Sequence, residues 1–148
     1  MEDLIANPAF RTYAFCSAIL GIKMLYSGVH TGTTRSKHLG FINQEDATVF
    51  GPGGAVAHEQ ETPEVAHALR IQRNDLENIP LFFAIGLIYV LSGASPFGAR
   101  FFCWIFTLAR LAHTYFYQNH IQPWRAVSFV IGSVAVVGMI LRVMWNVL

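Results

Sequence analysis

The sequence predicts an all-α membrane protein, with one domain over residues 1–148 in which four helices form a bundle. Hydrophobic residues make up 53% of the chain and charged residues only 13%, whereas charged residues are about 25% of an ordinary soluble domain. Four apolar stretches, at residues 10–29, 79–91, 97–116 and 127–147, are separated by polar segments. Three of them approach the roughly 20 residues that a bilayer-crossing helix needs.

A polar residue followed by proline precedes each predicted helix. These pairs are Asn7-Pro8, Thr62-Pro63, Ser95-Pro96 and Gln122-Pro123. Proline suits the first turn of a helix because its missing N–H would have no helical partner there. The first helix should end at Arg35, and it should stay in the mature protein because the acidic N-terminus lacks the basic flank and cleavage site of a secretory signal.

The second predicted helix joins a polar block to an apolar run. Its apolar part, residues 79–91, is too short to cross a hydrocarbon core of roughly 30 Å at about 1.5 Å per residue. The helix should therefore begin at Pro63, include the polar block and run to about Leu91. Pro80 is expected to kink it, because proline lacks the N–H of the helical hydrogen bond.

The connector between the first two helices sets the predicted orientation. Its segment GPGGAVAHEQET, residues 51–62, combines glycine, proline and charges and predicts a mobile connector. With four spans, this connector lies on the same side as the turn between the third and fourth helices. More basic residues lie near the side of this connector than near the opposite side, so the positive-inside rule places the connector in the cytoplasm. The residues near the connector side are Arg35, Lys37, Arg70, Arg73 and Arg125, and those near the opposite side are Arg11, Arg100 and Arg142.

Several classes of site have no support in the sequence. Cys16 and Cys103 lie in apolar stretches without a CxxC partner, so they are interpreted as packing residues. The six histidines show no metal-ligand spacing, and no glycine cluster is followed by the Lys-Ser/Thr of a phosphate loop. A net charge of +1 does not indicate the basic surface that nucleic-acid binding requires.

Polar side chains gather where the predicted helices meet the cytoplasmic face. Ionisable groups at membrane depth are costly and normally line a site, so an excess of arginine predicts an anionic ligand. The gathered residues are Arg35, Arg70, Arg73, Asn74, Glu77, His113, Tyr117 and Arg125. Three alternatives remain open: arginines at helix ends that reach the interface, a solvated start of the second helix, and charge neutralisation within the bundle for Lys23, Asp75 and Arg110.

Five motifs resemble a known family in their order and spacing. They are IKM at residues 22–24, FINQEDA at 41–47, RNDLENI at 73–79, ARLAHT at 109–114 and QPWRAVSF at 122–129. The chain thereby resembles the membrane-associated proteins in eicosanoid and glutathione metabolism. Its nearest members in these motifs are the microsomal glutathione transferase 1 type and microsomal prostaglandin E synthase.

This resemblance implies a homotrimer of four-helix subunits with glutathione bound between neighbours near the cytoplasmic side. It implies a microsomal detoxification enzyme, a glutathione transferase acting on hydrophobic electrophiles, with lipid hydroperoxide reduction as a further peroxidase activity. The membrane would be the endoplasmic reticulum in a eukaryote or the inner membrane in a bacterium. Arg125 would stabilise the thiolate, and the other matched positions would contact glutathione: Arg35, Arg70, Arg73, Asn74, Glu77, His113 and Tyr117.

Two positions depart from the prostaglandin synthase pattern. That pattern has serine directly after the fourth-helix arginine and tyrosine three residues later, where this chain has Ala126 and Phe129. The departure favours a transferase. A prostaglandin E synthase-like isomerase and a non-catalytic lipid-binding member of the family remain the alternatives.

Overall fold

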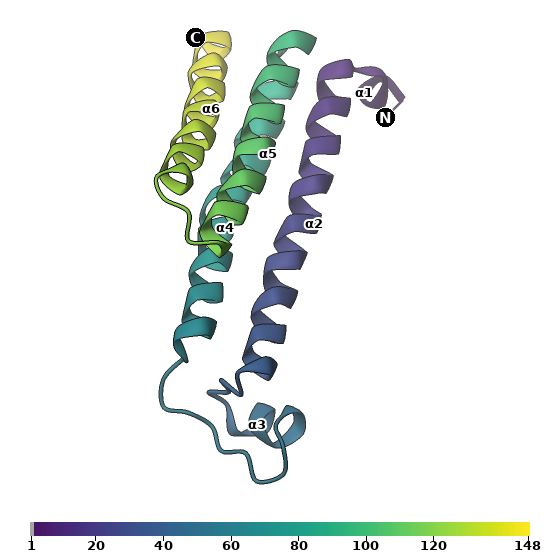
Figure 1. Ribbon diagram of the computed structural model, residues 1–148. Coiled ribbons are helices and arrows are strands. Elements are labelled where there is room, and N and C mark those ends of the chain that lie inside the picture. The colour runs from purple at the N-terminus through teal and green to yellow at the C-terminus, as the bar shows by residue number, and fades with distance from the viewer. Residues whose placement is uncertain (1) are drawn as a thin grey trace. The chain divides into compact units, whose positions relative to one another are not determined.

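The computed structural model describes residues 2–148, and within them every regular element is a helix (Figure 1). The helices are α1 Glu2–Ala6, α2 Pro8–Lys37, α3 Gln44–Phe50, α4 Pro63–Leu91, α5 Pro96–Gln118 and α6 Trp124–Val147. The all-α prediction is confirmed. The boundaries of α4 coincide with those predicted for the second helix, so its polar and apolar halves belong to one continuous helix.

The chain divides into two compact units. The first contains the chain up to Lys23 and from Leu76 to Leu148, and the second contains Met24–Asp75. Helices α2 and α4 each contribute to both units. The single domain and the trimer stay predictions.

Among residues 2–148, three helices are long and apolar enough to cross a membrane: α2, α4 and α6. Helix α5 is not among them, and it carries Arg100 and Arg110 within its 23 residues. Three spans are therefore supported by length and composition, and the four-span bundle stays a prediction. So does the kink at Pro80, which lies inside the helix α4.

Capping groups explain where the helices begin. Asn7 Oδ1 accepts from the Ala9 N–H at 2.8 Å, and Ser95 Oγ accepts from the Gly98 N–H at 3.1 Å. Both contacts satisfy N–H groups that have no partner within the helix. The predicted proline in the first turn is confirmed for α2, α4 and α5 but is wrong for the last helix, because Pro123 has ψ 0° and lies just before α6.

Left-handed residues explain where helices α2 and α5 end. Leu39 has φ 51°, and the Gly40 N–H donates back to the Arg35 carbonyl at 2.9 Å. His120 has φ 57° and is followed by the same type of contact, from the Ile121 N–H to the Phe116 carbonyl at 2.9 Å. These hydrogen bonds define Schellman motifs, which close the helix after an αL residue. Helix α2 thus runs to Lys37, two residues beyond the predicted end at Arg35.

The connector of the second unit contains helix α3, which the sequence analysis did not predict. Ala47 is buried in it. The Gln44 side chain donates to the Ala55 carbonyl at 3.2 Å and accepts from the Ala57 N–H at 3.1 Å. One side chain thereby holds the following segment by its main chain, in a region predicted only to be a mobile connector.

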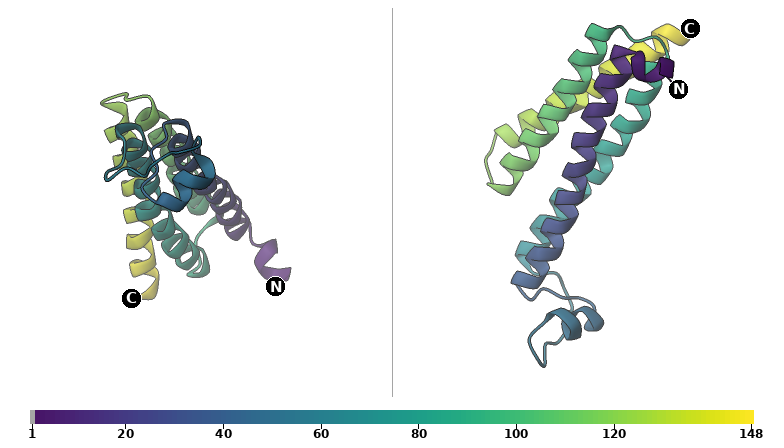
Figure 2. Two further views of the ribbon diagram at one scale, coloured as in Figure 1. Left: turned by 90° about the horizontal axis from the view of Figure 1, so that it is seen from below. Right: turned by 90° about the vertical axis from the view of Figure 1, so that its right-hand side faces the viewer.

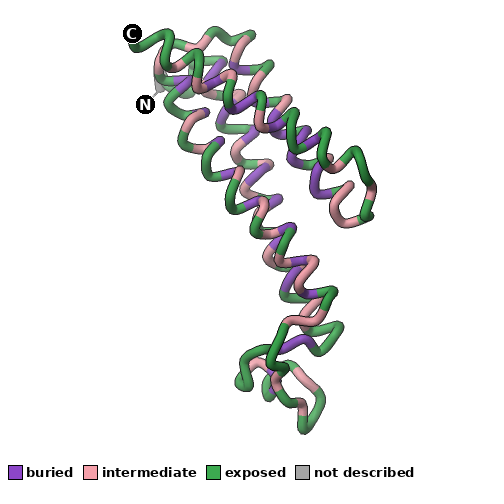
Figure 3. The backbone as a smooth tube through the Cα atoms, turned by 90° about the vertical axis from the view of Figure 1, so that its left-hand side faces the viewer, coloured by how far each residue is buried: buried purple, intermediate pink, exposed green. Residues whose placement is uncertain are grey.

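Packing in the first unit places α5 beside α6, and both views of Figure 2 show this pair. The Phe82 and Phe106 rings stack at 4.5 Å between centroids, and the Tyr13 hydroxyl donates to the Phe83 carbonyl at 2.8 Å. Cys16 and Cys103 are buried free thiols, as expected for packing residues. Buried and exposed positions alternate along the helices in Figure 3, and many exposed ones are large and apolar.

Candidate functional site

A cluster of three predicted site residues forms in the first unit, where α5 ends and α6 begins. His113 and Tyr117 lie one turn apart in α5, and Arg125 is the second residue of α6. The His113 and Tyr117 rings meet edge to face with centroids 5.6 Å apart. The Schellman motif at His120 reverses the chain between the two helices.

His113 joins the two helices through the main chain of α6. Its side chain is buried, and Nδ1 lies 2.9 Å from the carbonyl oxygen of Arg125. A carbonyl can only accept, so Nδ1 must carry the hydrogen. In the neutral ring the lone pair is then on Nε2, which fixes the tautomer.

The Arg125 guanidinium is held by neutral groups. Its central carbon lies 4.5 Å from the centroid of the Tyr117 ring, a cation–π contact. When the side-chain amide of Gln122 is oriented with its oxygen toward Arg125, Oε1 accepts hydrogen bonds from Arg125 Nη2 at 2.6 Å and from Arg125 Nε at 3.0 Å. No carboxylate in the described part of the chain pairs with Arg125. Its charge is therefore positioned but not neutralised, as an anion-binding group requires.

Three neighbours of this cluster were not recognised as site residues from the sequence. Gln122 was noted as the residue before Pro123 and as the first residue of the QPWRAVSF motif, although its three-residue spacing from Arg125 is the signal for a local contact. The Ser128 hydroxyl points back to its own helix, with Oγ 2.9 Å from the Trp124 carbonyl and 3.0 Å from the Arg125 carbonyl. The Phe129 ring lies 5.9 Å from the His113 ring and closes the cluster on its apolar side.

Arg35 lies in the second unit and forms an ion pair there. Its Nη2 is 2.7 Å from Oε1 of Glu61, and both side chains are partly exposed. Glu61 was not predicted, because its partner lies 26 residues earlier, across the whole connector. The predicted arginine thus has an internal carboxylate as its partner.

The remaining predicted residues lie along α4. Arg70 and Arg73 are exposed and Asn74 is half-buried, all in the second unit, whereas the exposed Glu77 belongs to the first. The structure therefore brings together His113, Tyr117 and Arg125. The convergence of the other five residues with this cluster stays a prediction.

Two charged residues outside the predicted site, Asp75 and Arg110, are buried. Asp75 is 1% exposed, and the Ser27 hydroxyl donates to its Oδ2 at 2.6 Å. Arg110 is also 1% exposed, and a Cβ placed at Gly132 would lie 3.6 Å from its Cδ. That distance is an ordinary van der Waals contact, so α6 packs against the aliphatic part of a buried arginine at this point. Charge neutralisation of these two residues within the bundle stays a prediction.

An apolar groove begins near the cluster on the outside of α5 and α6. Its volume is about 350 Å³. Residues that line it include Leu108, Ala112, Phe116, Trp124, Val127 and Ile131. Among the described residues there is no group of three or more His, Cys, Asp or Glu side chains that could hold a metal ion.

Comparison with known families matches residues 13–145 to the MAPEG family. The chain belongs to the MAPEG family. This confirms the family predicted from the five motifs. Together with the three candidate spans, it identifies the chain as a membrane protein.

Individual relatives of this MAPEG chain include two kinds of enzyme. It is 32% identical to human prostaglandin E synthase over 144 residues, covering 97% of the chain and 93% of the relative. The bovine prostaglandin E synthase is also 32% identical, over 145 residues that cover 97% of the chain and 93% of the relative. Human microsomal glutathione S-transferase 1 is 33% identical over 146 residues, covering 97% of the chain and 94% of the relative. Near-equal identities do not distinguish the two activities.

Proposed function

We propose that this MAPEG protein is an integral membrane glutathione transferase that joins the glutathione sulfur to hydrophobic electrophiles. One observation carries the proposal: Arg125 is fixed against Tyr117 and Gln122 with no carboxylate partner in the described chain. Such a guanidinium suits an anionic sulfur, since oriented donors stabilise charge most strongly where they need not reorganise.

The chemistry follows from the thiol. A free cysteine thiol with a pKa of about 8.5 is mostly protonated at neutral pH, and the thiolate is the nucleophile. Arg125 favours the thiolate, and the thiol proton passes to solvent. With an aryl halide, a carbon–sulfur bond then forms and the carbon–halogen bond breaks, so that halide leaves with the bonding electrons.

Glutathione offers complementary charges to the other predicted residues. Its two carboxylates suit arginine side chains, and its α-amino group suits the carboxylate of Glu77. We propose Arg35, Arg70, Arg73, Asn74, Glu77, His113 and Tyr117 as its contacts, between neighbouring copies of a homotrimer and toward the cytoplasm. The membrane is the endoplasmic reticulum or a bacterial inner membrane.

The apolar co-substrate has a route from the lipid. The groove lined by Leu108, Phe116 and Ile131 opens on the outside of the helices and includes Trp124, the residue before Arg125. A hydrophobic electrophile or lipid hydroperoxide dissolved in the bilayer could collect there before it meets the thiolate. Hydroperoxide reduction is proposed as a second reaction of the same thiolate: two glutathione molecules are oxidised to the disulfide, and the hydroperoxide is reduced to an alcohol and water.

The test is a glutathione titration of purified protein in detergent, followed at the thiolate absorbance, together with conjugation of an aryl halide. Replacing Glu77 with alanine should weaken glutathione binding by about 1.5 to 3 kcal/mol, the range for a hydrogen bond to a charged group. The matched control is Glu64→Ala, since Glu64 is an exposed carboxylate in the first turn of the same helix. A parent protein that neither binds glutathione nor conjugates the aryl halide would refute the proposal.

A second candidate is a glutathione-dependent isomerase, favoured by the 32% identity to prostaglandin E synthases. It would use the same thiolate on an endoperoxide. Ala126 and Phe129 count against it, because neither supplies the hydroxyl expected from that pattern. Product analysis with an endoperoxide substrate, after subtraction of its spontaneous breakdown, decides between the two activities. Glutathione binding without either reaction would favour a non-catalytic member.

A further inference from the structure

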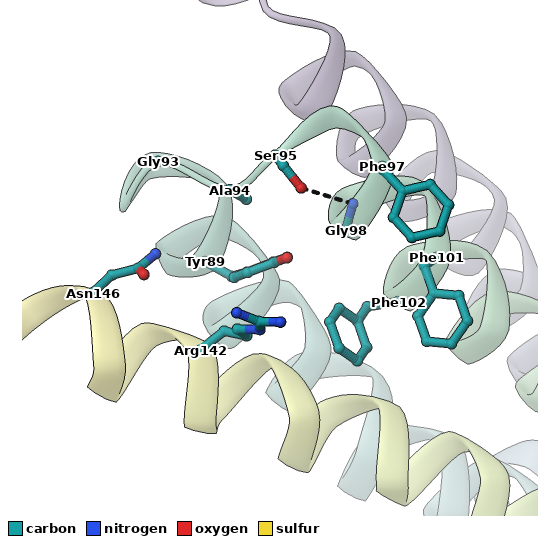
Figure 4. Close-up of a pocket in the computed structure, with 10 residues that line it drawn as sticks. All are labelled: Tyr89, Gly93, Ala94, Ser95, Phe97, Gly98, Phe101, Phe102, Arg142 and Asn146. Carbon is teal, nitrogen blue, oxygen red and sulfur yellow. Dashed lines mark hydrogen bonds between the residues drawn. The ribbon is translucent and has the colours of Figure 1, made fainter.

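A second polar hollow lies at the opposite end of α6 from Arg125. Arg142 lines it, and the 17 residue steps from Arg125 to Arg142 span about 25 Å at the helical rise. The hollow has a volume of about 420 Å³ and is enclosed by the end of α4, the start of α5 and the end of α6 (Figure 4). All its residues belong to the first unit, and none is in the proposed glutathione site.

Tyr89 directs an unsatisfied hydroxyl into this hollow. Its side chain is only 3% exposed, and Figure 4 shows the hydroxyl turned toward the space beside Gly98. The ring is held edge-on by Phe102 at 5.8 Å between centroids. Within residues 2–148 no group forms a hydrogen bond with this hydroxyl. The hydroxyl oxygen keeps access to the hollow although the rest of the side chain is buried, so it can donate a hydrogen bond to an acceptor bound there.

Gly98 makes room for the Tyr89 hydroxyl at the start of α5. A Cβ at this position would collide with the Tyr89 oxygen. The hydroxyl therefore lies against the N-terminal turn of a 23-residue helix, where the peptide dipoles carry partial positive charge. The N-terminal turn and the tyrosine donor together favour an anion.

Arg142 adds a full positive charge to the same hollow. Figure 4 shows its guanidinium beside Tyr89. No carboxylate of the described chain pairs with it, and no acidic residue lines the hollow. The nearby Asn146 amide is already engaged, because its Nδ2 donates to the Ser92 carbonyl at 3.1 Å. The charge in the hollow is therefore positive and uncompensated.

The hollow opens onto an aromatic surface. Phe97 is 78% exposed and Phe101 is 51% exposed, and their rings stack with centroids 6.3 Å apart. Both line the hollow together with the polar groups. A free inorganic anion would leave this surface uncovered, whereas an amphiphile would cover it with hydrocarbon.

We propose that this hollow binds an anionic phospholipid. The phosphate accepts hydrogen bonds from the Arg142 guanidinium and from the Tyr89 hydroxyl of α4, and it lies beside the start of α5. The acyl chains lie against Phe97 and Phe101. The proposal rests on the membrane character of the chain and not on its reaction with glutathione.

The experiment is native mass spectrometry of the delipidated full chain in a non-ionic detergent. The probes are dioleoyl phosphatidylglycerol, dioleoyl phosphatidylcholine with the same acyl chains, and soluble glycerol phosphate. The parent should retain one phosphatidylglycerol per chain in preference to the other two probes. Arg142→Gln should weaken that binding about tenfold, the effect of one lost charged hydrogen bond, and Tyr89→Phe should weaken it by a smaller factor.

Arg100→Gln is the matched control, since Arg100 is exposed near the start of α5 but lines a different hollow, with Arg11 and Trp104. It should change phosphatidylglycerol binding by less than about twofold, as a surface charge outside the site. If Arg100→Gln and Arg142→Gln lost phosphatidylglycerol binding equally, the lipid would be held by the general positive charge of the surface, and the proposed site would be overturned. Equal retention of the two lipids would overturn the role of charge, and glycerol phosphate binding as tightly as phosphatidylglycerol would overturn the role of the acyl chains.

Discussion

Replacing Arg125 with leucine tests whether this residue generates the thiolate. A unit charge within about 4–6 Å of a titrating group typically shifts its pKa by 1–3 units. Arg125 is half-buried, so its charge is only partly screened, and Tyr117 and Gln122 keep its guanidinium in place. We therefore expect the pKa of bound glutathione to rise by about 1 to 2 units in Arg125→Leu. At neutral pH this lowers the thiolate fraction and the turnover by roughly ten- to a hundredfold.

The assay is the thiolate absorbance of the glutathione complex as a function of pH, with aryl halide turnover measured on the same samples. Glutathione affinity should change less than turnover, because the other contacts remain. Arg125→Lys keeps the charge but loses the two-nitrogen contact with Gln122, so its pH profile should lie between those of the parent and the leucine variant. An unchanged pH profile in a folded Arg125→Leu protein would refute the assignment of Arg125 to the thiolate.

Three further predictions concern stability, each measured as the thermal midpoint in detergent. Ser27→Ala removes the donor to buried Asp75 and should destabilise the protein by about 1.5 to 3 kcal/mol; an unchanged midpoint would mean that this hydrogen bond contributes little. Leu39→Gly relieves a left-handed residue at φ 51° and should stabilise by about 1 kcal/mol, so a lower midpoint contradicts the strain argument. Gly98→Ala brings a Cβ against the Tyr89 hydroxyl and should cost about 1 to 3 kcal/mol. Adding Tyr89→Phe should restore part of that loss, and no recovery would place the clash elsewhere.

The fold was largely predictable because its main signals are local. Helix α4 begins at Pro63 and ends at Leu91 as predicted, since proline sets the start and the apolar run ends at a Ser-Gly turn. The capping serine before α5 was visible for the same reason. Helix α3 was missed because its seven residues are too few to show a clear helical period.

Contacts between distant segments could not be predicted in the same way. Periodicity placed Arg35 at a helix end, but nothing local indicates Glu61 as its partner. The spacing of His113 and Tyr117 in α5 was visible, whereas the contact of His113 with a main-chain carbonyl of α6 was not. Main-chain acceptors occur at every residue, so sequence alone does not indicate which one a buried histidine will use.

The contact between His113 and the carbonyl of residue 125 has an evolutionary consequence. The hydrogen bond recognises the peptide group and is indifferent to the side chain at that position. Mutations at residue 125 can therefore exchange one functional group for another while the turn between α5 and α6 keeps its anchor. A descendant protein could therefore change its reaction by substitutions in the first turn of α6, while the hydrogen bond between α5 and α6 stays in place.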